Sequence, residues 1–366
     1  MSGVRLLPRA RLEALPEALR ALGYEVLGPR VEDGVLRYGP LADVGDLPWG
    51  RGVEAAPGRW RLVEGEPGRA FAWANGPQAL KPLVFAPEET LWRSDAAGCV
   101  QAEPPAGRPR AVLGVRACDL AALALLDAHF LRPGCEDPWY AARRAGLLLV
   151  AVHCTHPAAT CFCASTGDGP EARAGHDLAL WETEAGWLLE AAGARGAEVL
   201  GRLPTEEADP ASVEAARAEV RAAAARQARA LPGRDLREAL FARLDHPRWA
   251  RVAERCLACG SCTAVCPTCF CHATDEHPAL DGTSAHGRRW SSCFTERHSY
   301  IHGIVLRADT RARYRQWLTH KLGGWHLQYG RSGCVGCGRC IAWCPAGIDL
   351  TEEAAAICAG AAEAAP

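Results

Sequence analysis

The sequence predicts two kinds of structure in one chain: an α/β domain over residues 1–200 and a cysteine-rich α+β domain over residues 255–352. Three observations lead to this expectation. A strand–helix–strand pattern fills residues 111–154, helix-forming segments rich in Ala and Arg fill residues 201–254, and 18 cysteines occur among 366 residues, most of them beyond residue 255. A chain of this length is expected to form two or three domains.

The first 110 residues predict short elements. Leucines spaced near 3.6 residues predict a helix over residues 9–22. Apolar runs interrupted by Gly and Pro then predict short strands. These runs are YEVLGP, VLRYGP, RWRLVE, FAWANGP and KPLVFAP.

Residues 111–200 predict a parallel sheet. The runs AVLGV (111–115) and GLLLVAVHC (146–154) are typical of buried strands, and DLAALALLDAHFL (119–131) between them predicts a helix. This order favours a parallel strand pair, because the helix supplies the crossover. The segment 181–190 predicts an edge hairpin.

Two regions complete the domain plan. Residues 201–254 predict a helical connector, because Ala and Arg are strong helix formers. Residues 353–366 predict a tail that starts as a short helix and frays.

Composition and charge exclude several classes of protein. A net charge of −2 with 23% charged residues fits neither a disordered acidic chain nor a protein that binds nucleic acid in bulk. No uncharged apolar run is long enough to predict a membrane span, and the first residues lack the apolar core of a secretory signal. We therefore expect a cytoplasmic protein, in which numerous cysteines favour metal binding or redox chemistry over disulfides.

The pattern C-x2-C-x2-C-x3-C-P occurs twice, at residues 256–267 and 334–345. This spacing is typical of [4Fe–4S] clusters: three close thiolates hold one cluster, and the fourth Cys, ahead of Pro, ligates the other. The predicted ligands are Cys256, Cys259, Cys262 and Cys344 for cluster 1, and Cys334, Cys337, Cys340 and Cys266 for cluster 2. The alternative of structural zinc is disfavoured, because zinc sites use two C-x2-C pairs each.

The spacing thus predicts a helical, ferredoxin-like domain with two [4Fe–4S] clusters over residues 255–352, enlarged by a helical insertion between the motifs. The insertion contains a basic stretch over residues 288–331. Three readings of it remain open: a solvated helix, positive charge near a cluster or partner, and nucleic-acid binding. Its basic residues are Arg288, Arg289, Arg297, Arg307, Arg311, Arg313, Arg315, Lys321 and Arg331.

Four further cysteines occur near the ends of the two predicted buried strands. They are Cys118, Cys154, Cys161 and Cys163. The carboxyl ends of parallel strands meet at one sheet edge, so these thiols could gather there as a third cluster site. The competing reading is that Cys118 and Cys154 are small buried apolar residues.

The remaining cysteines carry no spacing signal. Cys269, Cys271 and Cys293 lie near the first motif in roles that the sequence does not assign, and Cys99, Cys135 and Cys358 are expected to be incidental. Among the scattered histidines only His153, adjacent to Cys154, is of interest as a ligand.

Motifs for other cofactors are missing from the sequence. It contains no G-x-G-x-x-G opening a βαβ unit, no phosphate-binding G-x-x-x-x-G-K-[ST], no G-x-S-x-G and no H-E-x-x-H. The sequence thus has ligands for clusters but no motif for nicotinamide, flavin or a catalytic metal. This combination predicts a chain that conducts electrons between other subunits.

The chain resembles a family of iron–sulfur electron-transfer subunits. This family includes the beta subunit of soluble nickel–iron hydrogenases (sulfhydrogenases) and the corresponding iron–sulfur subunit of anaerobic sulfite reductase. The similar segments are GVRACDLAAL (114–123), TCFCASTGDGP (160–170), RCLACGSCTAVCPTCFC (255–271), RRWSSC (288–293) and SGCVGCGRCIAWCP (332–345).

The resemblance implies a cytoplasmic multi-subunit enzyme. A partner subunit would carry FAD and bind NAD(P)H, and another would hold a nickel–iron centre or sirohaem. The family also has Cys at the positions of Cys118, Cys154, Cys161 and Cys163, which favours a third cluster there, and at those of Cys269, Cys271 and Cys293.

The resulting hypothesis is an electron-transfer subunit of a hydrogenase, without a catalytic site of its own. An alternative is the iron–sulfur subunit of an anaerobic sulfite or sulfur reductase. An alternative from another class is an iron–sulfur redox sensor, which would require a DNA-reading or effector domain that the sequence does not predict. No nucleic acid or membrane is expected as a partner.

Overall fold

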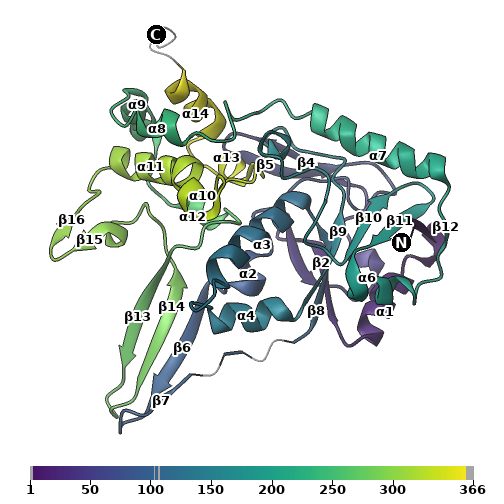
Figure 1. Cartoon of the computed structure of the whole chain (residues 1–366), viewed down its shortest axis with the longest axis horizontal. Helices are drawn as coiled ribbons and strands as arrows, with labels where there is room; N and C mark the ends of the chain where they lie inside the picture. Colours follow the sequence, from purple (N-terminus) through teal and green to yellow (C-terminus); the bar gives the residue numbers. More distant parts are fainter. Residues whose placement is uncertain (1–2, 103, 106–107, 360–366) are drawn as a thin grey trace.

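An eight-stranded mixed sheet forms the N-terminal half of the chain, in the order β12–β1–β11–β10–β9–β8–β2–β3 (Figure 1). The computed structural model describes residues 3–102, 104–105 and 108–359. The strands of this sheet are β1 (Arg5–Pro8), β2 (Glu25–Glu32), β3 (Val35–Pro40), β8 (Arg110–Val115), β9 (Leu147–Val152), β10 (Leu178–Glu182), β11 (Gly186–Ala191) and β12 (Glu206–Glu207).

The centre of the sheet is parallel and buried. Strands β2, β8, β9 and β10 pair in parallel, which confirms the predicted pairing of β8 with β9. All six residues of β9 are buried, as expected for a strand covered on both faces. The helices around it are α1 (Ala14–Ala21), α2 (Lys81–Val84), α3 (Ala117–Phe130), α4 (Pro138–Ala145) and α6 (Gly193–Leu200), with 3-10 turns at Arg9–Arg11 and Val44–Asp46.

Three N-terminal predictions are wrong in detail. The segment 181–190 forms the hairpin β10–β11, but not at an edge, because β1 pairs with β11 on its other side. The run FAWANGP is not a strand: the Arg116 guanidinium binds the carbonyls of Phe71 and Trp73. The run KPLVFAP forms α2 instead, since proline suits a first helical turn.

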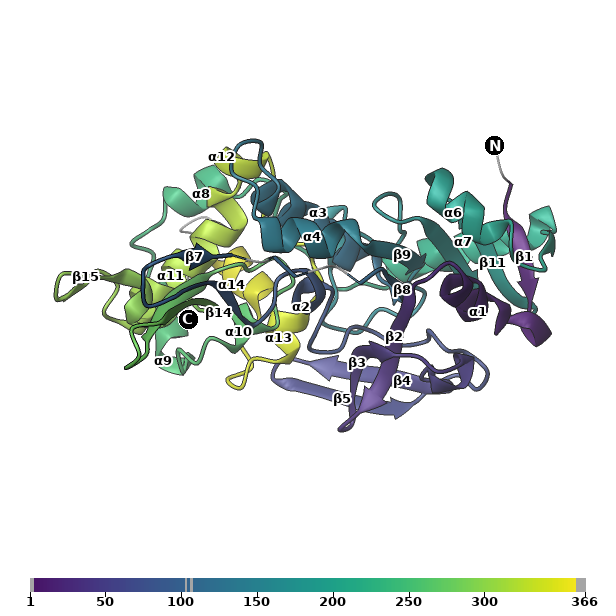
Figure 2. The same cartoon turned by 90° about the horizontal axis from the view of Figure 1, so that it is seen from below.

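A two-stranded hairpin connects the sheet to the C-terminal region. It consists of β4 (Arg51–Ala56) and β5 (Arg59–Glu64), and lies apart from the large sheet in Figure 2. Gly58 at its turn donates a 3.0 Å backbone hydrogen bond to Ile341, and the ring of Trp60 stacks on Trp343 at 5.6 Å.

The connector between the two cysteine-rich regions is helical, with α7 (Pro210–Ala225), α8 (Arg237–Phe241) and α9 (Arg248–Arg255). Helix α7 begins at an Asp209 cap and runs across the large sheet in Figure 1. Helices α8 and α9 pack instead on the C-terminal core through Leu240 and Trp249, both fully buried.

The C-terminal region is built from short helices around the two motifs. They are α10 (Ser261–Ala264), α11 (Thr310–Thr319), a π-turn (His320–Gly324), α12 (His326–Tyr329), α13 (Arg339–Ala342) and α14 (Leu350–Cys358). Helix α14 is part of the core, because the fully buried Glu353 pairs with Arg248 and Arg255 of α9. Of the predicted tail, residues 360–366 lie outside the described residues.

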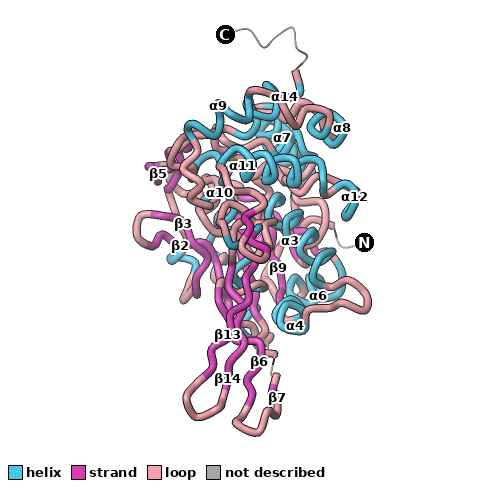
Figure 3. Tube along the Cα trace, turned by 90° about the vertical axis from the view of Figure 1, so that its left-hand side faces the viewer, coloured by secondary structure: helices cyan, strands magenta, loops and turns pink. Residues whose placement is uncertain are grey.

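The insertion differs from the helical segment that the sequence suggested. Besides α11 it contains the long hairpin β13 (His272–Pro278) and β14 (Ser284–Trp290), the small hairpin β15 (Tyr300–Ile301) and β16 (Ile304–Val305), and a 3-10 turn at Arg297–Ser299. Strand β14 pairs with β6 (Glu88–Ser94), which pairs with β7 (Val100–Gln101). This four-stranded sheet extends away from the body of the molecule (Figure 3) and interlocks the two halves of the chain.

The basic stretch of the insertion serves mainly internal contacts. Ion pairs join Arg288 to Glu89 and Asp137, Arg289 to Asp275, Arg313 to Glu296, and Arg331 to Asp168. These charges are therefore divided among several elements. No helix in the described part of the chain is long and apolar enough to cross a membrane.

Candidate metal centres

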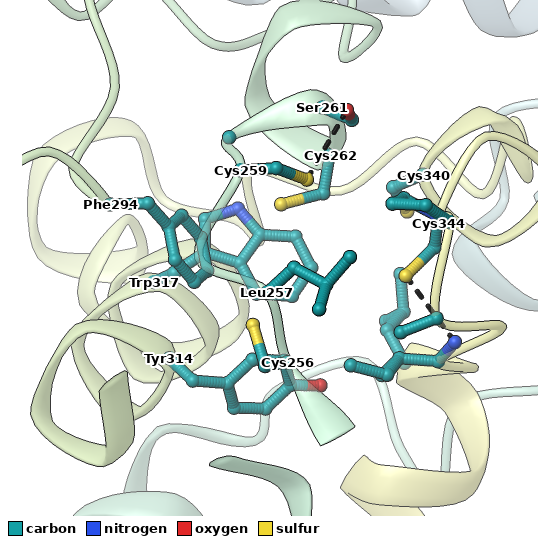
Figure 4. Close-up of a pocket in the computed structure, with 15 residues that line it drawn as sticks. Cys256, Leu257, Cys259, Ser261, Cys262, Phe294, Tyr314, Trp317, Cys340 and Cys344 are labelled. Atoms are coloured by element: carbon teal, nitrogen blue, oxygen red, sulfur yellow. Dashed lines mark hydrogen bonds between the residues drawn. The ribbon is translucent and has the colours of Figure 1, made fainter. Parts of the chain in front are cut away.

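The four cysteines predicted for cluster 1 line one cavity, which we call the C-terminal cavity (Figure 4). They are Cys256, Cys259, Cys262 and Cys344. The space measures about 460 Å³ counted to its open mouth. Cys340 of the second motif also borders it. The structure thus brings Cys344 to the first motif across more than 80 residues of sequence, as crossed ligation requires.

Local backbone geometry turns these thiols toward a common point. Helix α9 ends at Cys256, and Ala258 and Gly260 both adopt left-handed conformations, with φ of 49° and 77°. The short helix α10 then carries Cys262. A Cβ on Gly260 would lie 3.0 Å from Ser292 Oγ, so glycine also permits close packing there.

The wall of the C-terminal cavity fits an anionic cluster rich in hydrogen-bond acceptors. Phe294, Tyr314 and Trp317 line it, and the hydroxyl of Tyr314 and the indole nitrogen of Trp317 are buried without a hydrogen-bond partner in the described part of the chain. A buried donor without an acceptor is costly, and cluster sulfurs are acceptors. Ile348 N also donates to Cys344 Sγ at 3.4 Å.

One side of this cavity reaches the surface. Cys259 is exposed, and the neighbouring Leu257 side chain is 68% exposed. On the inner side, burial raises the pKa of Cys262 well above its usual value, and the charge of Cys293 raises it further. Metal coordination offsets such a shift because the bound thiolate gives up its proton.

The four cysteines predicted for cluster 2 are also neighbours. Burial raises the pKa of Cys334 to about 12, and the nearby Cys337 and Cys266 add to this rise. The pKa of Cys340 is raised in the same way, first by burial and then by the charges of Cys334, Cys337 and Cys266. Gly336 N donates to Cys334 Sγ at 3.5 Å, the kind of N–H···S bond that stabilises a thiolate.

A second cavity, the N-terminal cavity, gathers the other four predicted thiols. It is lined by Cys118, Cys154, Cys161 and Cys163. They come from the start of α3, the end of β9 and the loop that leads into α5 (Cys163–Thr166). The carboxyl ends of β8 and β9 therefore meet as the sequence predicted. Cys337 of the second motif also borders this cavity.

A buried arginine lines the N-terminal cavity. Arg116 is 2% exposed and its guanidinium lies 4.1 Å from the Trp73 ring, but its Nε and Nη1 have no hydrogen-bond partner among the described residues. Asn75 donates to Cys118 Sγ at 3.3 Å, and Gln227 donates to Cys163 Sγ at 3.2 Å. These donors suit an anionic cluster better than four neutral apolar thiols.

Comparison with known proteins identifies the family. Residues 255–348 match the model of the 4Fe-4S dicluster domain. Sulfhydrogenase 2 subunit beta of Pyrococcus furiosus is 32% identical over 244 residues, which cover 65% of this chain and 71% of that protein.

The chain belongs to the sulfhydrogenase beta-subunit family.

As a member of this family it is an iron–sulfur electron-transfer subunit that carries two [4Fe–4S] clusters, which excludes the zinc alternative. No solved structure matches the chain. In the described residues no three His, Cys, Asp or Glu side chains converge as they would on a single metal ion. The cysteines of the C-terminal and N-terminal cavities instead line open space.

Two glycines interlock the cysteine regions of this chain. A Cβ on Gly336 would lie 2.6 Å from the Cys163 backbone, and one on Gly338 would lie 2.3 Å from the carbonyl oxygen of Thr160. Sequence analysis did not find this packing, because both glycines also belong to a cluster motif. The buried ion pair of Arg339 with Asp119, at 2.7 Å, joins the same two regions.

The remaining histidine and cysteine candidates lie outside the proposed ligand sets. His153 stacks on Trp181 at 4.0 Å and accepts a hydrogen bond from Ala172 N, so its side chain has a packing role. Cys99 and Cys135 are exposed and outside both cavities. Cys358 packs against the C-terminal core.

Proposed function

We propose that this chain passes single electrons between two partners: a flavin-containing, NAD(P)-binding reductase on one side, and a hydrogenase catalytic subunit on the other. The family relation supports the hydrogenase context, since the relative is a sulfhydrogenase subunit. Each bound cluster would supply a centre that accepts and releases one electron. The residues of this chain hold the clusters, exclude water and set the spacing between them.

The proposed ligands follow the two crossed sets. Cys256, Cys259, Cys262 and Cys344 hold cluster 1, and Cys334, Cys337, Cys340 and Cys266 hold cluster 2. Cys118, Cys154, Cys161 and Cys163 hold a third cluster. The Arg116 side chain supports the third site, because it lines the cavity and keeps two guanidinium nitrogens without a hydrogen-bond partner among the described residues.

The observation that carries the proposal is the position of the second cysteine set. Cys340 borders the C-terminal cavity, and Cys337 borders the N-terminal cavity. These two residues lie only three positions apart, on either side of the start of α13. We therefore place cluster 2 between the other two, in the linear order third–second–first.

The ends of this line differ in access to solvent. Cys161 and Cys163 of the N-terminal cavity are buried, whereas Cys259 of the C-terminal cavity is exposed beside Leu257. A redox partner could thus approach cluster 1 most closely at Leu257. This surface is our proposed docking point for one of the two partner subunits.

The test is anaerobic purification of the tagged chain from cells that express its natural complex. We expect co-purified flavin and nickel, together with NAD(P)H-dependent reduction of the clusters that disappears when the flavin subunit is removed. Sirohaem in place of nickel would indicate the sulfite reductase type. Oxidation of NADPH or hydrogen by the isolated chain would refute the relay role.

A further inference from the structure

The base of the β13–β14 hairpin brings together three cysteines that the proposed relay does not use. His272 pairs with Trp290 at the end of the ladder, and Ser291 N donates to the Cys271 carbonyl at 2.8 Å. Cys271 therefore lies opposite Ser291, with Cys293 two residues beyond. Cys269 lies two residues before Cys271, in the segment that leads into β13. The hairpin closes a sequence gap of about 20 residues around these thiols.

The thiols are close enough to influence one another's ionisation. Burial raises the pKa of Cys293 to about 12, and the charge of Cys271 adds to the rise. For Cys269, a hydrogen bond with Cys266 is the main cause of a raised pKa, and Cys271 contributes as well. The group also borders both crossed sets, through Cys262 and Cys266.

Two buried lysines face this group. Lys81 of α2 is 4% exposed, and its ammonium donates to the carbonyls of Ala264 and Cys269, both at 3.2 Å. Lys321 of the π-turn is 5% exposed and donates to Thr268 Oγ1 at 2.8 Å. Within the described residues, neither ammonium pairs with a carboxylate.

Thiols surround the two ammonium groups. Burial lowers the pKa of Lys81, and the charges of Cys269, Cys266 and Cys271 oppose this effect. The charges of Cys266, Cys269 and Cys334 likewise raise the pKa of Lys321 against the effect of its burial. The two lysines also lie over tryptophan rings, Lys81 at 3.9 Å from Trp290 and Lys321 at 4.5 Å from Trp325. Carbonyls and rings compensate a buried cation only partly, so two such cations favour negative charge on the neighbouring thiols.

We propose that Cys269, Cys271 and Cys293 bind a further iron–sulfur cluster through three thiolates, with Lys81 and Lys321 as its counter-charges. On binding, each of the three thiols loses its proton and gains an iron–sulfur bond. This site is additional to the three centres of the relay.

The experiment measures iron and acid-labile sulfide per chain, with Mössbauer spectra, on the anaerobically purified complex. The variant is Cys271→Ser with Cys293→Ser. We expect a loss of about 4 iron atoms relative to the unmodified chain, with the signals of clusters 1 and 2 retained. The matched control, Cys99→Ser with Cys135→Ser, should lose none. An unchanged iron content in the Cys271/Cys293 variant overturns the proposal.

A second variant decides the matter if the Cys271/Cys293 variant loses every cluster. The pair Cys118→Ser with Cys154→Ser removes the proposed third cluster and keeps clusters 1 and 2, which account for about 8 iron atoms. An iron content of this variant clearly above that number supports the additional site, and a content of about 8 or fewer overturns it. This outcome does not depend on whether the third cluster of the proposed relay exists.

Discussion

The C-terminal and N-terminal cavities each gather four proposed cluster ligands, but in different surroundings. The C-terminal cavity is walled by Phe294, Tyr314 and Trp317 and opens to the surface at Cys259. The N-terminal cavity is walled by the polar side chains of Arg116, Asn75 and Gln227 and is more deeply buried at its thiols. Both cavities offer hydrogen-bond donors, but among the described residues only the N-terminal cavity has a cation, Arg116, in its lining. A cation near a cluster favours the reduced state.

In the proposed relay, this difference would give the two cavities different roles. A cluster in the N-terminal cavity would hold an electron more firmly, and a cluster in the accessible C-terminal cavity would exchange electrons with a partner. The two cavities also differ in how far the sequence predicts them. The motif spacing predicts the ligands of the C-terminal cavity, whereas the N-terminal cavity forms only where a sheet and a loop fold together.

The largest expected effect tests the crossed ligation of the C-terminal cavity. Cys344→Ser should remove the same cluster as Cys259→Ser, with a loss of about 4 iron atoms and the same missing EPR signal. Cys337→Ser should remove a different signal, and Cys358→Ser, as the control, should remove none. If Cys344→Ser and Cys337→Ser give the same spectral defect, ligation is not crossed.

The next test asks whether the N-terminal cavity is a metal site at all. Cys154→Ser should lower the iron content by about 4 atoms and leave the signals of clusters 1 and 2 intact. Cys135→Ser, at an exposed cysteine between α3 and α4 of the same α/β region, is the control. Unchanged iron in the Cys154 variant would mean that its thiol is a buried apolar group.

A smaller effect is expected where the two cysteine regions interlock. Gly338→Ala places a methyl group 2.3 Å from the carbonyl oxygen of Thr160, in addition to the strain of a left-handed alanine. Gly330→Ala carries the same strain with nothing within 4 Å, and should cost about 1 kcal/mol.

Overpacking should therefore make Gly338→Ala less stable than Gly330→Ala by roughly 2 kcal/mol. Anaerobic thermal unfolding of the two variants measures the difference. Equal melting temperatures would show that the loop at 160–163 can shift to make room for a methyl group at residue 338 without a loss of stability.

The smallest effect concerns the strand that leads into the N-terminal cavity. Burial lowers the pKa of His153 to about 3, with smaller contributions from His176 and Arg217. The folded state therefore keeps this ring neutral while the unfolded chain binds a proton, so stability is present above about pH 6.5 and is lost as the pH falls toward 3.

Between about pH 7 and about pH 5, His153 should cost the fold up to roughly 2 kcal/mol. His153→Phe removes the titration and keeps a ring to stack on Trp181. Its urea midpoint should fall less between these pH values than that of the unmodified chain. Parallel losses in both proteins would contradict the assigned pKa.

Much of the fold was predictable where the pattern was local. The buried runs at β8 and β9 and the helix between them were recognised, because a covered parallel strand is continuously apolar. The run at 71–77 was not, because Arg116, remote in sequence, takes its carbonyls. The pairing of β14 with β6 was not predictable from the sequence either, since no local pattern links strands almost 200 residues apart.

The sequence by itself determined that the chain binds iron–sulfur clusters, because cluster chemistry demands cysteines at short, fixed separations. It also predicted which Cys of each motif crosses to the other. Only the tertiary structure decided what surrounds each set: the buried Arg116, the lysines near Cys269 and Cys271, and the position of Cys337 and Cys340 between two cavities. Compensating charge and distance between centres depend on side chains from separate elements, so they arise only when those elements pack together.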